Sequence, residues 1–258
     1  MTETATYKTI ETSREEGLFT LTLNRPQLNI LNMAMLGEIS LAVKEAQASG
    51  CGLLVLRAKG KAFSAGADVG EHLPDKVQPM LASFHGAIKD LYSFKGISIA
   101  CVHGSALGGG CELALAADLV LASAVAAFGQ PEIKLGVIPP VAMVLLPVLC
   151  HARAAREIVL SGESVGAEDA KRLGLANQVF AAEEFEAKTQ EYVGRFKAMS
   201  RSSLALAKKT MRRLHPVDFN DKLAAAEDAY LKELLATHDG TEGCKAFLEK
   251  RKPAWKHS

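Results

Sequence analysis

The amino-acid sequence predicts an α/β fold with a largely parallel sheet. Short apolar runs typical of buried strands alternate with segments of helical periodicity, and after about residue 195 only helical patterns remain. Strands separated by helices favour parallel pairing, because a parallel crossover needs a long connection. We therefore expect an α/β core over residues 1–195 and a helical C-terminal region over residues 196–258.

Four segments have the patterns of strands. Residues 17–23, GLFTLTL, alternate apolar and polar side chains, and Pro26 ends the strand because proline cannot donate to a ladder. The others are short apolar runs of the kind found in buried strands. They cover residues 52–58, 97–102 and 119–122.

Helical patterns lie between these strands and after them. Asn32 is a suitable N-cap for a helix in which Met35, Ile39 and Val43 share one face. Amphipathic segments in the C-terminal region should pack on the core or on a neighbouring subunit. The further predicted helices cover residues 78–94, 110–117, 202–214, 221–236 and 242–251.

Composition excludes several classes of protein. The chain is 48% hydrophobic and 23% charged, as in ordinary globular enzymes, and its formal net charge of +1 argues against a nucleic-acid surface built on bulk charge. The first 14 residues lack an apolar signal segment, and prolines interrupt the longest apolar stretch, residues 137–150. We expect a cytoplasmic protein without a membrane or nucleic-acid partner.

Cysteine and histidine spacing predicts no metal site. The five cysteines are odd in number and show no CxxC spacing, so neither a disulfide framework nor a zinc site is expected. His72 and His85 have no Cys or His partners at metal-ligand spacing, and His103 is interpreted as structural. A basic helical face is interpreted as solvated rather than as a phosphate contact. It consists of Lys208, Lys209, Arg212 and Arg213.

Two glycine-containing turns are candidates for binding a ligand through their backbone N–H groups. Residues 104–112, GSALGGGCE, follow a predicted strand, and their three consecutive glycines open a helix whose N-terminus offers free N–H donors. Close helix packing would also use glycine, but three in succession exceed that need. The pattern is neither GxGxxG nor a Walker A loop. The second motif, KAFSAGADV over residues 61–69, read alone favours a plain turn at Gly66.

Glu112 and Glu132 are the candidate acid–base pair. Glu112 lies just inside the helix that the glycines open, and Glu132 follows Pro131 in FGQPEIKLG. Each has a simple alternative explanation, as a first-turn residue that complements the helix dipole or as an exposed loop glutamate. Two carboxylates near one donor-rich turn can divide acid and base roles between them. Their separation in sequence does not establish that they meet.

Six segments together resemble the crotonase (enoyl-CoA hydratase/isomerase) superfamily. They occur in the family's order and almost end to end: LNRPQLNILN, KGKAFSAGADV, HGSALGGGCELALAADL, FGQPEIKLGVIP, LSGESVGAEDAKRLGLANQVF and AFLEKRKPAW. The resemblance implies a crotonase-type spiral of ββα units as the CoA-binding and catalytic core, with a helical C-terminal trimerisation region. It also implies a homotrimer or a dimer of trimers, and no cofactor, since CoA is part of the substrate.

The resemblance implies roles for particular residues. The backbone N–H groups of Ala67 and Gly109 would form the oxyanion hole for the thioester oxygen. Glu112 and Glu132 would add water across a C=C bond conjugated to the thioester. Charged tail residues and Arg25 would meet the phosphates of CoA. The full set of implied substrate and CoA contacts is Arg25, Ala65, Asp68, Val69, Pro140, Lys250 and Lys252.

One segment departs from the usual family pattern. Where typical hydratases have a GAGGTQRL-like stretch, residues 138–149 read IPPVAMVLLPVL, which predicts an apolar, stiffer wall of the acyl pocket at residues 140–143. Together with GADVGEHLPD, this stretch resembles the cyclohexa-1,5-diene-1-carbonyl-CoA hydratases of anaerobic aromatic degradation. An enoyl-CoA isomerase, an acyl-CoA hydrolase and a non-catalytic or RNA-binding relative remain alternatives.

Overall fold

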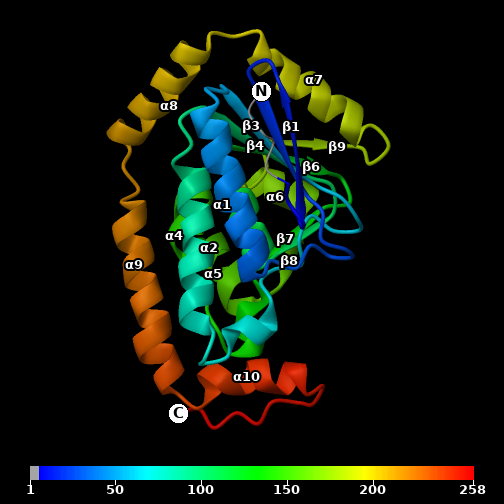
Figure 1. Cartoon of the computed structure of the whole chain (residues 1–258). Coiled ribbons are helices and arrows are strands. Elements are labelled where there is room, and N and C mark those ends of the chain that lie inside the picture. The colour runs from blue at the N-terminus through cyan, green and yellow to red at the C-terminus, as the bar shows by residue number, and fades with distance from the viewer. Residues whose placement is uncertain (1–5) are drawn as a thin grey trace.

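Two sheets form the centre of the molecule in the computed structural model, which describes residues 6–258 (Figure 1). The expectation of no signal segment therefore falls partly outside the described residues. The larger sheet has the strand order β1-β2-β3-β4-β6-β9, parallel throughout except for the β1–β2 hairpin. Its strands are Ile10–Glu15, Leu18–Leu23, Leu53–Ala58, Ile97–Val102, Leu119–Ser123 and Gln178–Phe180. The smaller sheet has the order β5-β7-β8, with strands Ser105–Leu107, Ala127–Gly129 and Ser164–Gly166.

Helices cover both faces of the larger sheet, which explains its apolar central strands. In β3, Leu54 and Leu56 belong to the main core with α1 (Met33–Ala48) and α2 (Val77–Tyr92). Leu53 and Val55 point the other way, into a second cluster with α7 (Phe185–Lys197). A strand buried on both faces needs apolar residues at every position, so β3 and β4 carry no polar alternation.

The predicted start of α1 is confirmed. Oδ1 of Asn32 accepts a hydrogen bond of 3.0 Å from the N–H of Met35, so one of the unpaired donors of the first turn is satisfied. Met35, Ile39 and Val43 are buried in the main core, and α1 packs against α2. The residue before this N-cap, Leu31, forms a parallel bridge with Ala67, so the fixed start of the helix helps to position that contact.

The C-terminal region wraps around the core, as Figure 1 shows for α8, α9 and α10. The helix predicted over residues 221–236 is not continuous. It consists of α9, a π-helical turn (η3) and a 3₁₀ turn (η4), and this change of pitch gave no signal in the apolar periodicity. The bounds are Arg201–Leu214 (α8), Phe219–Asp228 (α9), Ala229–Glu233 (η3), Leu234–Ala236 (η4) and Asp239–Leu248 (α10). The boundary between core and appendage at residue 195 stays a prediction.

The basic face of α8 is not uniformly solvated, which corrects the interpretation drawn from the sequence. Lys208 is buried, and its Nζ donates to the carbonyl oxygens of Phe94 and Gly96 at 2.7 Å each. It also forms an ion pair of 2.5 Å with Asp118, which accepts a further bond of 3.1 Å from Arg212. The opposing acidic residue lies 90 positions away, so no local pattern could have revealed it.

The remaining helices connect the strands and frame the cavity. None of the helices among residues 6–258 is long and apolar enough to cross a membrane. In the same range, no three His, Cys, Asp or Glu side chains are grouped as a metal site would require. The bounds are Val69–His72 (η1), Gly109–Leu115 (α3), Pro131–Leu135 (η2), Pro140–Leu149 (α4), Ala152–Ser161 (α5) and Ala167–Leu173 (α6).

Candidate active site

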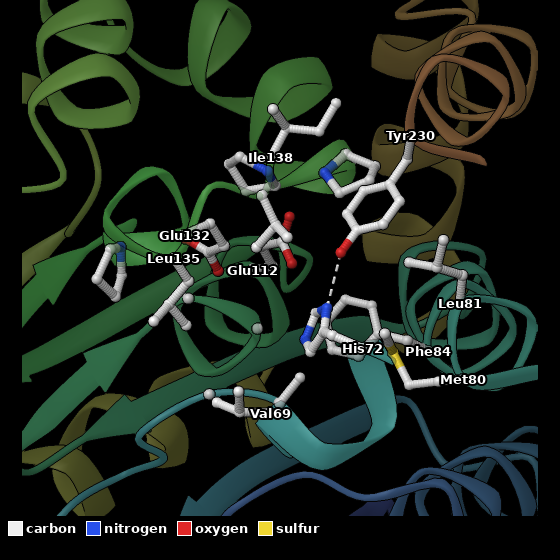
Figure 2. Close-up of a pocket in the computed structure, with 18 of the residues that line it drawn as sticks. Val69, His72, Met80, Leu81, Phe84, Glu112, Glu132, Leu135, Ile138 and Tyr230 are labelled. Carbon is white, nitrogen blue, oxygen red and sulfur yellow. Dashed lines mark hydrogen bonds between the residues drawn. The ribbon is translucent and has the colours of Figure 1, made fainter. Parts of the chain in front are cut away.

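A cavity of about 90 Å³ lies where the first turns of α3 and α4 meet η1, η2, α2 and η3 (Figure 2). Its wall is mostly apolar, with side chains such as Val69, Phe84 and Ile138. Polar groups enter it at only a few points. They are the carboxylates of Glu112 and Glu132, the side chains of His72 and Tyr230, and the backbone of residues 65–67 and 108–109.

Two backbone N–H groups lie side by side at this cavity. Ala67 forms a parallel bridge with Leu31 through the carbonyl of Gly66 and the N–H of Asp68, so its own N–H points to the other side. Gly109 opens α3, where the N–H has no intrahelical acceptor. An ideal Cβ on Gly109 would lie 3.4 Å from the nitrogen of Ala67, which places the two turns against each other. Within residues 6–258, neither N–H has a hydrogen-bond acceptor.

Gly66 and Gly108 make this juxtaposition possible. Gly66 has φ of +108°, and an added Cβ would lie 3.0 Å from the carbonyl oxygen of Leu107. Gly108 has φ of +50° and caps α3. Residues with a side chain rarely adopt either conformation, so these two glycines set the direction of the N–H groups that follow them.

Glu112 is held by the N-terminus of α4. Its side chain is buried, and Oε1 accepts a hydrogen bond of 2.7 Å from the N–H of Ala142, the third residue of that helix. Burial raises the pKa of Glu112, whereas the N–H groups of Ala142 and Val141 act in the opposite direction. A helix N-terminus favours negative charge, so this carboxylate is the better placed of the two to be ionised.

Glu132 occupies a different environment. It lies on η2 against Gly108, and a Cβ at residue 108 would overlap Oε1 of the glutamate. Its carboxylate end is buried, and Oε2 has no hydrogen-bond partner among the described residues. Burial, and then the charge of Glu112, raise the pKa of Glu132. Since two neighbouring buried carboxylates resist ionising together, the shared proton is favoured on Glu132.

The structure gathers most of the predicted residues and leaves others outside. Glu112, Glu132, Gly109 and Ala67 line one cavity, and so do Ala65, Val69 and Pro140. Asp68 lies beside it and caps η1, with Oδ1 accepting from the N–H of Gly70 at 3.0 Å. The guanidinium of Arg25 donates to the carbonyl of Ile30 at 2.7 Å and so braces its own loop. Lys250 and Lys252 are exposed in the tail after α10. Their proposed contacts with CoA stay predictions.

The prediction that residues 140–143 form an apolar wall of the acyl pocket is wrong for residues 141–143. Residues 140–149 form α4, because Pro140 occupies the first helical position, where proline is tolerated. Pro139 and Pro140 line the cavity, but the side chains of Val141 and Ala142 are buried in the core and Met143 is 39% exposed. The segment therefore contributes backbone N–H groups to Glu112 more than a surface to a ligand.

Two polar residues of the cavity gave no functional signal in the sequence. The spacing of His72 bears only on metal ligation, and Tyr230 lies in a helical region expected to pack on the core or on a neighbouring subunit. Nδ1 of His72 lies 2.9 Å from the hydroxyl oxygen of Tyr230, as the dashed line in Figure 2 shows. The two residues are 158 positions apart in the sequence, so no local pattern could have paired them.

Fold and site together define an α/β protein whose cavity combines two unpaired backbone N–H donors with two carboxylates, as enzymes that stabilise an oxyanion and transfer protons do. The family model "Enoyl-CoA hydratase/isomerase" matches residues 13–258. The chain therefore belongs to the enoyl-CoA hydratase/isomerase family. The predicted crotonase-type fold and enoyl-CoA hydratase-like lyase class are confirmed at this level, whereas the assembly and the acyl substrate stay predictions.

Individual relatives agree with this assignment. A cyclohexa-1,5-dienecarbonyl-CoA hydratase of Thauera aromatica is 37% identical over 262 residues, which cover 100% of this chain and 100% of that protein. A probable enoyl-CoA hydratase of Rhizobium meliloti is 37% identical and covers 96% of this chain and 97% of its own length. The crystal structure of an enoyl-CoA hydratase from Mycobacterium avium subsp. paratuberculosis K-10 matches with a TM-score of 0.87 at 26% identity, covering 97% of this chain and 100% of that chain.

Proposed function

We propose that the protein adds water to a C=C bond conjugated to a CoA thioester. The observation that carries the proposal is that two buried carboxylates in unlike environments share one cavity with two unpaired backbone N–H donors. A hydratase needs all of these groups at once, because it must place charge on the thioester oxygen and move two protons.

The thioester carbonyl is bound by the N–H groups of Ala67 and Gly109. Water addition turns the thioester into an enolate, so negative charge grows on the oxygen that these donors face. Fixed donors in an apolar cavity stabilise that charge without reorganising, and one such donor contributes on the order of 10²–10³ in rate. Gly66 and Gly108 support this role by fixing the two turns.

The two glutamates divide the proton transfers. Ionised Glu112 accepts a proton from water, whose oxygen forms the new bond at the β-carbon. Protonated Glu132 donates its proton to the α-carbon, so the substrate gains one hydroxyl and one hydrogen. The α4 N-terminus supports the charge on Glu112, and the missing partner of Glu132 Oε2 supports the proton there. The proposed reaction needs no cofactor, since CoA arrives with the substrate.

The proposed substrate is a cyclic dienoyl thioester, cyclohexa-1,5-diene-1-carbonyl-CoA, in aromatic degradation. The support is the activity named for the Thauera aromatica relative and the apolar wall of the cavity. We place the protein in the cytoplasm as a homotrimer or a dimer of trimers. Exposed apolar side chains on α8 support an assembly, since Leu206, Met211 and Leu214 are 63%, 66% and 65% exposed.

A hydration assay with product analysis tests the function. Crotonyl-CoA and cyclohexa-1,5-diene-1-carbonyl-CoA are supplied separately, and the masses of the products are measured by mass spectrometry. Hydration adds one water to the mass, isomerisation leaves the mass unchanged, and hydrolysis releases the CoA thiol. A product without added water on both substrates would replace the hydratase assignment with one of the two alternatives on the same scaffold.

A further inference from the structure

The pair of His72 and Tyr230 lies in the cavity wall, and the hydration steps above do not use it (Figure 2). His72 ends η1, and its Nδ1 is 2.9 Å from the hydroxyl oxygen of Tyr230. Tyr230 is fully buried. Around the pair, the cavity surface is apolar, with Met80, Leu81 and Phe84 beside it. A polar pair in such a wall loses solvation, so its hydrogen-bonding groups need partners.

A local distortion of the backbone brings Tyr230 to this position. The chain leaves α9 at Asp228 and passes through the π-helical turn Ala229–Glu233 before the 3₁₀ turn that follows. Single π-helical turns are rare, and they occur frequently at functional sites. Tyr230 is the buried residue of this turn and points at His72.

Counting hydrogens shows that the pair has one donor too many. Burial lowers the pKa of His72 to about 4, so the ring is neutral near pH 7 and carries one N–H. Burial also raises the pKa of Tyr230, which keeps its O–H. The bond between them uses one of these two hydrogens. Across residues 6–258, neither side chain has another hydrogen-bond partner. Whichever tautomer is present, one N–H or O–H has no acceptor among the described residues.

In this structure the cavity wall does not supply the missing acceptor. Met80, Leu81 and Phe84 of the wall are apolar, and although the charge of Glu132 acts on Tyr230, neither carboxylate forms a hydrogen bond with the pair. A hydrocarbon acyl group that displaced water from this wall would leave the donor unpaired, and that loss is about 10-fold or more in affinity. An oxygen on the acyl group would remove the loss.

We propose that His72 and Tyr230 are specificity-determining residues that donate a hydrogen bond to an oxygen on the acyl group other than the thioester carbonyl. The preferred acyl groups are therefore those with a hydroxyl or keto substituent, and an unsubstituted diene meets the requirement only once hydration has added its hydroxyl. The inference rests on the proposed function in one respect, namely that the acyl group occupies this cavity.

The experiment measures binding of saturated thioesters by calorimetry. Butyryl-CoA is compared with 4-hydroxybutyryl-CoA, and cyclohexanecarbonyl-CoA with derivatives hydroxylated at ring carbon 3 or 4. In each pair the two thioesters differ by one oxygen. None of the hydroxylated compounds carries its hydroxyl at the β-carbon, which is ring carbon 2 in the cyclic series and is the carbon that hydration would use. The wild-type protein should bind at least one hydroxylated member about 10-fold more tightly than its parent.

Variants identify the groups responsible. His72→Leu leaves the phenol O–H and Tyr230→Phe leaves the imidazole N–H, so each single variant should keep part of the preference. The double variant has no donor and should bind both members of each pair equally. Met80→Leu, in the same wall, is the matched control and should leave the ratio unchanged. Equal wild-type affinity for every pair, or a preference that survives in the folded double variant, would overturn the inference.

The binding ratio is independent of turnover. Because the saturated thioesters cannot be hydrated, a preference for oxygen in a protein without hydratase activity would overturn the proposed function and support this inference. Hydration of enoyl-CoA by a protein that shows no preference would do the reverse. The wild-type comparison needs no variant, so a double variant that failed to fold would still leave the inference open to refutation.

Discussion

The N–H of Ala142 donates a hydrogen bond of 2.7 Å to Oε1 of Glu112, and this bond connects the first turn of α4 to the first turn of α3. The N-terminus of α3 thus supplies the N–H of Gly109 to the cavity, and the N-terminus of α4 binds the carboxylate of Glu112. Glu132 receives no such support. The difference between the two carboxylates leads to the first predictions.

Replacing either glutamate should abolish most of the activity. We expect Glu112→Gln and Glu132→Gln each to lower kcat by about 10²–10⁴, the usual contribution of a positioned acid or base. Acyl-CoA affinity should change little, because the donors at Ala67 and Gly109 remain. Hydration rates and calorimetric affinities check the two halves of this prediction, and wild-type rates in both variants would show that the acid–base assignment is wrong.

The pH profile of kcat/KM should be bell-shaped and centred well above the ordinary glutamate value of 4.5. The proposed mechanism needs Glu112 ionised and Glu132 protonated, and burial raises the pKa of both. The rate should therefore rise as Glu112 loses its proton and fall as Glu132 loses the second one. Removing the acid with Glu132→Gln should remove the high-pH limb from the residual activity. A wild-type profile that rises at pH 4–5 and then stays flat would contradict the raised pKa values.

The same raised pKa values predict how stability depends on pH. The folded protein holds these protons more tightly than the unfolded chain, so the free energy of unfolding should fall as pH rises from about 4.5 through the raised values. Each unit of pKa shift corresponds to about 1.4 kcal/mol. Urea unfolding of Glu132→Gln should show a shallower decline than the wild type. An identical slope in both proteins would exclude Glu132 as its source.

Gly108→Ala should disturb the site more than a glycine substitution elsewhere. A methyl group there would overlap Oε1 of Glu132 and would also occupy a backbone with φ of +50°. We expect a loss of about 1–3 kcal/mol in stability and at least a 10-fold loss in kcat. Gly194→Ala is the control, because this helical residue has open space around it. It should be stabilised by about 0.4–1 kcal/mol with unchanged kcat.

Lys208 should contribute more to stability than its neighbour on α8. Lys208→Ala removes three hydrogen bonds and leaves Asp118 with less of its compensating charge, which should cost about 3–5 kcal/mol. Lys209→Ala changes an exposed residue on the same helix and should have little effect. Chemical unfolding measures both, and equal changes would show that burial of the Lys208 ion pair does not stabilise α8.

The apolar patterns predicted the central strands well, because their signal is local. β4 has the predicted bounds, Ile97–Val102, and Asn32 caps α1 as expected. The edge strand β1, Ile10–Glu15, was missed because most of its residues are exposed and polar, so only its pairing with β2 makes it a strand. The three-residue strands of the smaller sheet are likewise set by pairing and not by composition.

For the site, the sequence identified groups but not their relations. The two glycine turns were identified because glycines occur where predicted strands end. The two glutamates were identified because Glu112 lies beside one of these turns and Glu132 directly follows Pro131. The support that Ala142 gives Glu112 is a backbone contact, and any residue except proline could make it. The pairing of His72 with Tyr230 depends on a π-helical turn far along the chain. Neither relation has a local pattern that could predict it.

The position of Tyr230 has a consequence for synthesis of the protein. A nascent chain that has reached residue 195 already contains both glutamates and both N–H donors, yet it lacks a side chain that closes the cavity. These groups are therefore synthesised before the side chain that closes their cavity. Closure of the cavity then waits for the docking of α9, which packs on α4, and of η3, which carries Tyr230.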